Sequence, residues 1–299
     1  MNDDVLREIV SHADIRSVFR FCQVNKTLCH QQDDLFKHIY QRLYNHTSMA
    51  VFKNNTMTWF QLIKQCYLLE QLRIKIVYKY SIKELYTLQA LDLSHNQLSA
   101  LPPEIGQLSH LKYLDLSNNQ LSALPPEMGQ LGALHTLYLS HNQLSALPPE
   151  IGQLSALQKL YLSNNQLSVL PPEMGHLSAL QSLSLHNNQL SALPPEIGRL
   201  SALQNLDLSY NQLSVLPPEI GLLGHLQYLY LSNDQLSALP PEIGQLNKLK
   251  ELYLFNNQLS ALPPEMGQMR DLRYLYLHNN QLSTLPPEMC QLNNLYIGW

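Results

Sequence analysis

The chain has 299 residues and a formal net charge of −4, with 19 Lys and Arg against 23 Asp and Glu. This length allows two ordinary domains, or a small domain followed by a repeat array. The charge is unevenly divided: residues 1–87 hold 12 basic against 8 acidic side chains, and residues 88–299 hold 7 against 15. Because phosphate neutralisation needs clustered Lys and Arg, the acidic second part excludes nucleic acid as its partner.

Cysteine spacing and hydropathy exclude further classes of protein. The four cysteines form no CxxC pair and no metal-ligand spacing. No apolar run approaches membrane-spanning length, and the acidic N-terminus lacks a signal-peptide core. We therefore expect no metal, no cofactor, no membrane segment and a reducing compartment, the cytoplasm or the nucleus.

The first 44 residues contain no proline and show apolar side chains at helical spacing. Two helices are expected within residues 1–22 and a third within residues 33–44. Their apolar positions include Val5, Leu6, Ile9, Ile15, Val18, Leu35 and Phe36. Three short helices make a small core, so we expect residues 1–44 to form a helical domain that docks onto another protein.

This helical segment resembles an F-box. The features that match are a D-I-x-x-V start to the second helix at Asp14, a V-x-K string at Val24 and a D-L-F-K string at Asp34, with Phe36 where Trp is common. The resemblance implies docking onto the Skp adaptor of a cullin–RING ubiquitin ligase. The adaptor-binding residues that it implies are Val5, Leu6, Ile9, Ile15, Val18, Val24, Leu35 and Phe36. F-box segments joined to repeats are also similar to proteins of large DNA viruses of amoebae, which would place the chain in the host-cell cytoplasm.

Residues 45–87 connect the helical segment to the rest of the chain. Residues Arg73 to Tyr80 alternate apolar and basic side chains, as a half-exposed strand would. Leu85 and Leu88 already match the leucine spacing that follows them. We interpret this stretch as a linker and an N-terminal cap of the array.

From residue 88 to residue 299 the sequence repeats every 23 residues without an insertion. Each copy follows the frame LxxLxLxxNQLSxLPPExGxL, and all 18 prolines fall in nine Pro-Pro pairs. The Asn position of the frame is occupied by Asn96, Asn119, Asn142, Asn165, Asn188, Asn211, Asp234, Asn257 and Asn280. Nine copies and the start of a tenth therefore form one repeat domain.

The frame itself predicts the fold. In LxxLxL, Leu91 and Leu93 lie on one side of a short strand and Asp92 lies on the other. Strands of successive coils pair in parallel, and the Asn amide turns inward to bond the backbone of neighbouring coils. The Pro-Pro pairs exclude a central strand or a helix interior and favour an extended return. We expect an α/β solenoid that is stable only because its coils stack.

Residues 88–299 resemble the typical 23-residue class of leucine-rich repeats, including intracellular repeats with LPPEIGxL. The resemblance implies a curved right-handed solenoid with a parallel sheet on its concave face, where such proteins usually bind a protein partner. The nine copies differ mainly at outward strand positions of that sheet, and tyrosines gather there. The residues that we predict to contact a partner are Tyr113, Tyr138, Tyr161, Tyr228, Tyr230, Tyr253, Phe255, Tyr274, Tyr276 and His278.

Tyrosine is common in protein interfaces, although aromatic residues also simply suit an exposed sheet. Asp92, Asp115 and His95 suggest a metal or acid–base site, but solvated polar side chains explain them better, so no catalytic residue is predicted. The apolar C-terminal edge at Leu295 and Ile297 predicts a homodimer. The sequence therefore favours a receptor that brings a protein to a ubiquitin ligase; the alternative is a scaffold whose N-terminal helices only cap the solenoid.

Overall fold

The computed structural model describes residues 82–299. The chain divides into two compact units, with the boundary between Leu88 and Gln89. Helix α6 (Ile82–Thr87) is the described element of the first unit, and the side chain of Leu85 on it is buried. The helices expected in residues 1–44 and the strand expected between Arg73 and Tyr80 lie outside the described residues.

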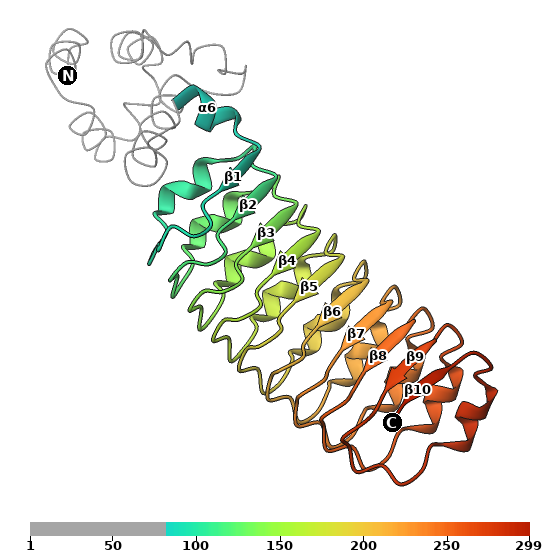
Figure 1. Cartoon of the computed structure of the whole chain (residues 1–299). Coiled ribbons are helices and arrows are strands. Elements are labelled where there is room, and N and C mark those ends of the chain that lie inside the picture. The colour runs from blue at the N-terminus through green and yellow to red at the C-terminus, as the bar shows by residue number, and fades with distance from the viewer. Residues whose placement is uncertain (1–81) are drawn as a thin grey trace, which may run out of the picture. The chain divides into compact units, whose positions relative to one another are not determined.

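The second unit is a solenoid of ten three-residue strands in one parallel sheet, arranged in chain order from β1 to β10 (Figure 1). The strands are β1 (Ala90–Asp92), β2 (Tyr113–Asp115), β3 (Thr136–Tyr138), β4 (Lys159–Tyr161), β5 (Ser182–Ser184), β6 (Asn205–Asp207), β7 (Tyr228–Tyr230), β8 (Glu251–Tyr253), β9 (Tyr274–Tyr276) and β10 (Tyr296–Gly298). The register pairs equivalent positions of successive copies, for example Leu91 with Leu114. The predicted α/β solenoid of leucine-rich repeats is thereby confirmed.

A 3-10 helix of five residues returns the chain between successive strands. These helices are η2 (Pro103–Gln107), η3 (Pro126–Gln130), η4 (Pro149–Gln153), η5 (Pro172–His176), η6 (Pro195–Arg199), η7 (Pro218–Leu222), η8 (Pro241–Gln245), η9 (Pro264–Gln268) and η10 (Pro287–Gln291). No helix in residues 82–299 is long and apolar enough to cross a membrane.

The prediction that each Pro-Pro pair forms an extended return is wrong for the second proline. Pro102 is extended, with φ −74° and ψ 147°, but Pro103 is the first residue of η2. The first position of a helix tolerates proline because its N–H has no partner within the helix. The pair therefore starts a helix and does not prevent one.

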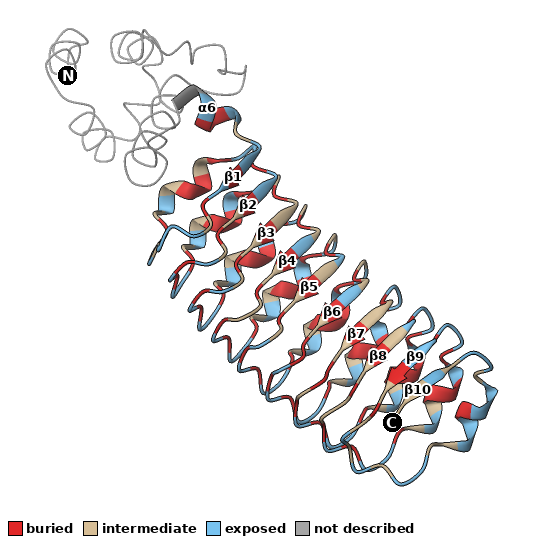
Figure 2. Cartoon of the chain, viewed as in Figure 1, coloured by how far each residue is buried: buried red, intermediate tan, exposed pale blue. Residues whose placement is uncertain are grey.

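Leucine side chains fill the interior of the coils. The middle residue of strands β1 to β9 is a leucine with at most 1% of its surface exposed. Leucines after the Asn position, such as Leu121 and Leu144, are equally buried, and Ile or Met of each 3-10 helix closes the far side. Figure 2 shows this pattern as red segments that recur in every coil. The core is therefore one continuous column.

A ladder of Asn side chains runs through the coils beside the strands, as predicted. Asn165 accepts from the N–H of Leu144 at 3.0 Å and donates to the carbonyl oxygens of Leu139 and Leu162, each at 3.0 Å. One side-chain amide thus forms hydrogen bonds with backbone groups of two successive coils. These backbone groups are buried and need such partners, because water does not reach them.

Asp234 interrupts this ladder. Its Oδ1 accepts from the N–H of Leu213 at 3.0 Å, but its buried Oδ2 has no partner. In the preceding coil the atom at that place is the donating Nδ2 of Asn211. Burial is the main reason that the pKa of Asp234 rises to about 7, against the lowering effect of its backbone hydrogen bonds.

A glycine in η2 to η9 allows the 3-10 helices of adjacent coils to approach closely. A β-carbon at Gly106 would lie 2.5 Å from the carbonyl oxygen of Glu127, and one at Gly129 would lie 2.7 Å from that of Glu150. No side chain fits at such distances, so the glycine is a packing requirement. Cys290 occupies the equivalent position in η10 and is exposed.

Candidate protein-binding face

The exposed face of the sheet, predicted as the concave surface, carries the side chains that differ between copies. In strands β1 to β9 the middle residue points into the core and its two neighbours point outward, as alternation along a strand dictates. Because equivalent residues pair across the sheet, the last strand residues form one continuous row from β1 to β10. The composition of this row decides what the face can bind.

Tyr138 on β3 and Tyr161 on β4 occupy successive rungs of this row, and Tyr113 is the first residue of β2, beside the row. We call these three residues the N-terminal tyrosine ladder. The ring centroids of Tyr138 and Tyr161 lie 4.7 Å apart with an interplanar angle of 11°, and Tyr113 is tilted against Tyr138 at 5.3 Å. The separation of Tyr138 and Tyr161 matches the spacing of strands, so these two rings are stacked along the axis of the array.

Three tyrosines on β7 to β9 form the C-terminal tyrosine ladder: Tyr230, Tyr253 and Tyr276. Successive centroids are 4.8 and 4.6 Å apart, with interplanar angles of 26° and 18°. Phe255 and His278 make a parallel pair at 4.5 Å, two residues after Tyr253 and Tyr276 in the chain. The predicted C-terminal contact residues thus lie side by side, and Tyr228 and Tyr274 occupy the outward position two residues earlier.

Carboxylates hold some of the tyrosine hydroxyls. The hydroxyl of Tyr253 donates to Oε2 of Glu251 at 2.9 Å. Burial, followed by this hydrogen bond and the charge of Glu251, raises the pKa of Tyr253. Burial and the charges of Glu251 and Asp207 likewise raise the pKa of Tyr230. The ladder therefore presents neutral phenols within a negative field.

Two strands without an aromatic residue in the row separate the ladders. Ser184 on β5 pairs with Tyr161 on one side, and Asp207 on β6 pairs with Tyr230 on the other. Oδ1 of Asp207 accepts from the N–H of Ser209 at 3.0 Å, and its Oδ2 lies 3.9 Å from Nδ1 of His186. This interruption depends on the stacking of neighbouring rings, which the sequence frame does not specify.

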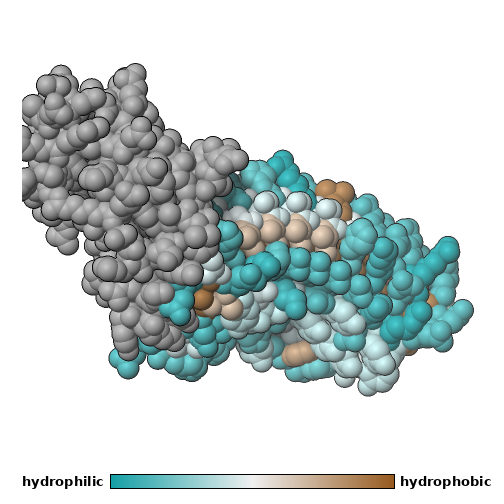
Figure 3. Space-filling model, turned by 90° about the horizontal axis from the view of Figure 1, so that it is seen from above, coloured by the Kyte–Doolittle hydropathy of each residue, from teal (hydrophilic) through white to brown (hydrophobic). Residues whose placement is uncertain are grey.

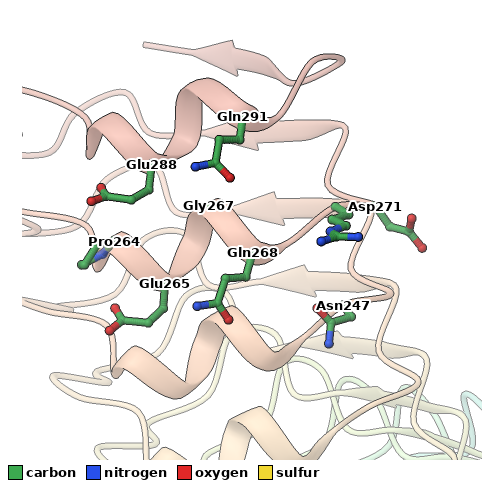
Figure 4. A pocket seen from close by; sticks show the side chains of 9 residues that line it. Asn247, Pro264, Glu265, Gly267, Gln268, Asp271, Glu288 and Gln291 are labelled. Carbon is green, nitrogen blue, oxygen red and sulfur yellow. The ribbon is translucent and has the colours of Figure 1, made fainter.

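The side opposite the sheet carries a polar groove between η9 and η10, seen in Figure 4. Glu265 and Glu288 lie one coil apart along it, as do Gln268 and Gln291. Glu and Gln recur at the same positions of most other coils, whereas Asn247, Arg270 and Asp271 of the lining are particular to this end of the array.

A second face of the array is mostly hydrophilic (Figure 3). On the face shown in Figure 3, hydrophilic residues dominate and the brown hydrophobic areas are small and separate. Within residues 82–299, no three His, Cys, Asp or Glu side chains converge as metal ligands. Asp92 and Asp115 pair across the sheet, and each accepts from the serine two residues later. These carboxylates organise their own turns.

The structure thus brings the ten predicted partner-binding residues onto one face in two groups. The adaptor-binding residues predicted in the first 44 residues lie outside the described part of the chain. The C-terminal group holds two stacked contacts in series, whereas the N-terminal group holds one stacked pair, Tyr138 and Tyr161, with Tyr113 tilted against it.

Known protein families match both parts of the sequence. A leucine-rich repeat region model matches residues 103–191, 172–257 and 219–297, and a single leucine-rich repeat model matches residues 87–108. The chain belongs to the leucine-rich-repeat family. The F-box domain model matches residues 1–40. No curated protein matches the chain.

Several solved leucine-rich-repeat structures are similar to this one. A leucine-rich-repeat protein of Leptospira interrogans is 40% identical with a TM-score of 0.63, covering 74% of this chain and 64% of that one. The leucine-rich repeat domain of the type III effector XopL is 29% identical with a TM-score of 0.67, covering 89% and 94%. The plant peptide hormone receptor RGFR1, in complex with RGF2, is 37% identical with a TM-score of 0.63, covering 70% and 35%. The chain spans less than two thirds of the Leptospira protein and of the plant receptor.

Proposed function

We propose that the chain is a receptor in which the exposed sheet face selects a protein and the N-terminal segment recruits a Skp–cullin ubiquitin ligase. The observation that carries this proposal is the combination of an F-box match at residues 1–40 with a leucine-rich-repeat array on residues 88–299. Such a receptor acts in the cytoplasm or nucleus and needs no catalytic residue, because transfer of ubiquitin belongs to the ligase.

The chemistry of the two tyrosine ladders supports a protein partner. A tyrosine offers a large apolar ring and a hydrogen-bonding tip, and it loses little rotamer entropy when it is held. Stacking against neighbours fixes the rings before any partner arrives, which reduces the ordering cost of association. The similar array of the plant receptor RGFR1 was solved in complex with RGF2, so a polypeptide is a suitable occupant for such a face.

Binding of purified full chain to the Skp adaptor, measured by calorimetry, tests the first half of the proposal. We expect tight binding that is lost in Ile9→Asp and Val18→Asp, because a charge in the docking face is left without a partner. Val169→Asp is the matched control. The side chain of Val169 is 59% exposed on the array, and its replacement introduces the same charge outside residues 1–40. If the folded chain does not bind the adaptor, the alternative function is favoured: a scaffold whose N-terminal helices only cap the solenoid.

Replacement of a whole ladder tests the second half. We expect the triple change of Tyr230, Tyr253 and Tyr276 to Ala to abolish crosslinking of partner proteins in cell extract while the array stays folded. The control changes the exposed Gln166, Gln189 and Gln212 to Ala, because they lie outside the sheet face. Retention of the same crosslinked proteins by the tyrosine variant would contradict the assignment of this face.

A further inference from the structure

The row of tyrosines lacks a ring at two consecutive rungs where the sheet continues without a break. Tyr161, Ser184, Asp207 and Tyr230 occupy consecutive rungs of the row on β4 to β7. At Ser184 the side chain is short, and its hydroxyl lies 2.7 Å from the hydroxyl of Ser163. Ser184 therefore leaves its rung without a ring, between the rung of Tyr161 and the rung of Asp207. We call the position above Ser184 the serine slot.

One wall of the serine slot is the face of an aromatic ring. Tyr161 is stacked on Tyr138 through one face, so its opposite face is directed along the array axis toward Ser184. A group above Ser184 lies one strand spacing, about 4.8 Å, from that ring. Cations are attracted to ring faces within about 6 Å of the centroid. The position thus suits a positive charge.

The other wall is a carboxylate. Asp207 uses Oδ1 for the N–H of Ser209, which leaves Oδ2 for another donor. Within the described residues, the basic side chain recorded near Asp207 is His186, at 3.9 Å, beyond hydrogen-bond range. One strand spacing also separates Asp207 from the position above Ser184, which is the distance at which a guanidinium reaches a carboxylate.

Carboxylates lie on the side of the serine slot that faces β6 to β8. The outward residues of β5 to β8 include the carboxylates of Asp207 and Glu251 and no Lys or Arg, whereas β4 carries the exposed Lys159 two residues before Tyr161. Tyr210, three residues after Asp207, has φ 59°, and its ring centroid lies 4.9 Å from that of His186. Six other copies place Asn at that left-handed position, where a bulky residue is disfavoured.

Building on the proposed function, we infer that the serine slot binds a basic side chain of the partner protein, an arginine, stacked on Tyr161 and paired with Asp207. Arginine fits better than lysine because its planar guanidinium stacks on a ring and offers several donors to a carboxylate. The partner's side chain lies on the ringless Ser184 rung beside Tyr161, with apolar residues on either side of it lying over the two ladders.

A short peptide tests this assignment on the full chain without knowledge of the partner. The probe is acetyl-Gly-Trp-Gly-Arg-Gly-Trp-Gly-amide, whose tryptophans flank the arginine by about 7 Å each when extended. Amide resonances of Ser184 and Asp207 are followed by NMR during titration at pH 7.5. We expect these resonances to shift. We also expect the peptide with citrulline, the neutral isostere of arginine, to bind about tenfold more weakly, and the lysine peptide to bind with intermediate affinity.

Two variants and one control locate the binding. Asp207→Asn should weaken the arginine peptide about tenfold while leaving the citrulline peptide unchanged. Ser184→Tyr, which fills the slot with the chain's own ring, should abolish binding of the arginine peptide. Asp115→Asn is the matched control, because Asp115 lies in the same row and bonds Ser117 as Asp207 bonds Ser209, but no empty rung adjoins it.

Each result decides the assignment. Equal affinity for the arginine and citrulline peptides, an unchanged affinity in Asp207→Asn, or no shift at Ser184 and Asp207 up to about 5 mM peptide would overturn it. The adaptor test uses Ile9 and Val18, and the crosslinking test uses tyrosines. Failure of the proposed function and failure of the serine slot are therefore separate outcomes.

Discussion

The buried and the exposed side of each strand differ more in residue type than equivalent positions of any two coils do. On the buried side, the middle residue is leucine in strands β1 to β9, and each is almost fully buried. On the exposed side, the adjoining position holds Asp, Tyr, Ser or Gly. Within one strand, the middle residue therefore contributes to stability, and the residue next to it contributes to recognition. Stacking fixes the first side because all coils must share one core, and it leaves the second side free to vary.

The largest difference in stability is expected between Leu160→Ala and Lys159→Ala, which change the buried and the exposed side of the same strand. Leu160 is fully buried and Lys159 is exposed. We expect the leucine change to lower the free energy of unfolding by about 2–5 kcal/mol through lost transfer energy and a cavity. The lysine change should cost less than about 0.5 kcal/mol. Urea denaturation measures both, and similar losses would contradict the division.

Removal of one ladder amide should have a somewhat smaller effect. Asn165→Ala leaves the N–H of Leu144 without its acceptor, whereas the carbonyls of Leu139 and Leu162 keep hydrogen bonds from Asn142 and Asn188. A buried unsatisfied donor costs about 1–3 kcal/mol, and we expect a loss in this range by urea denaturation. The exposed Gln166→Ala should change stability little, and a loss as large there would argue against the ladder.

Asp234→Asn should restore the ladder and stabilise the array by about 1–2 kcal/mol at neutral pH. The pKa of Asp234 is raised to about 7 in the folded chain from 3.8, so the protonated carboxyl is favoured on folding. Its stabilising contribution is complete below about pH 4 and is lost as the pH rises through 7. The advantage of Asn should therefore grow between pH 5 and pH 8, as followed by melting temperature. A constant advantage would show that ionisation of Asp234 is not its cause.

The smallest effect is expected for Tyr253→Phe. This change removes the hydrogen bond to Oε2 of Glu251 and keeps both stacked neighbours, Tyr230 and Tyr276. Because the hydroxyl reaches the surface, we expect a loss of less than about 1 kcal/mol in unfolding free energy. Tyr253→Ala should cost more, since it also removes the stack, and equal losses would show that stacking does not stabilise the ladder.

The sequence predicts the array well because its restraints are periodic. The 23-residue period, the inward turn of Asn165 and the outward direction of Tyr161 follow from the frame alone. The role of Pro103 could not be predicted from local preference, because proline is compatible with both an extended return and the start of a 3-10 helix. The packing of adjacent coils selects the second.

The candidate site was harder to predict than the fold. Ser184 is inconspicuous in the sequence, and it becomes notable only when rings stack on one side of it and a carboxylate lies on the other. Ring planes depend on contacts between residues 23 apart, and no local pattern reports them. A comparison of the copies by column identifies such gaps if stacking of neighbouring rings is assumed.

The glycine column also governs the curvature of the array. Pairing of strands sets the spacing of coils along the sheet at about 4.8 Å, whereas contact between 3-10 helices sets it on the opposite side. The bare backbone of Gly106 against Glu127 keeps that second spacing short. Alanine in place of each such glycine would act as a wedge, open the helical side and tighten the bend around the sheet. The absence of a β-carbon at this position in η2 to η9 therefore affects the radius of curvature of the sheet face that a partner would contact.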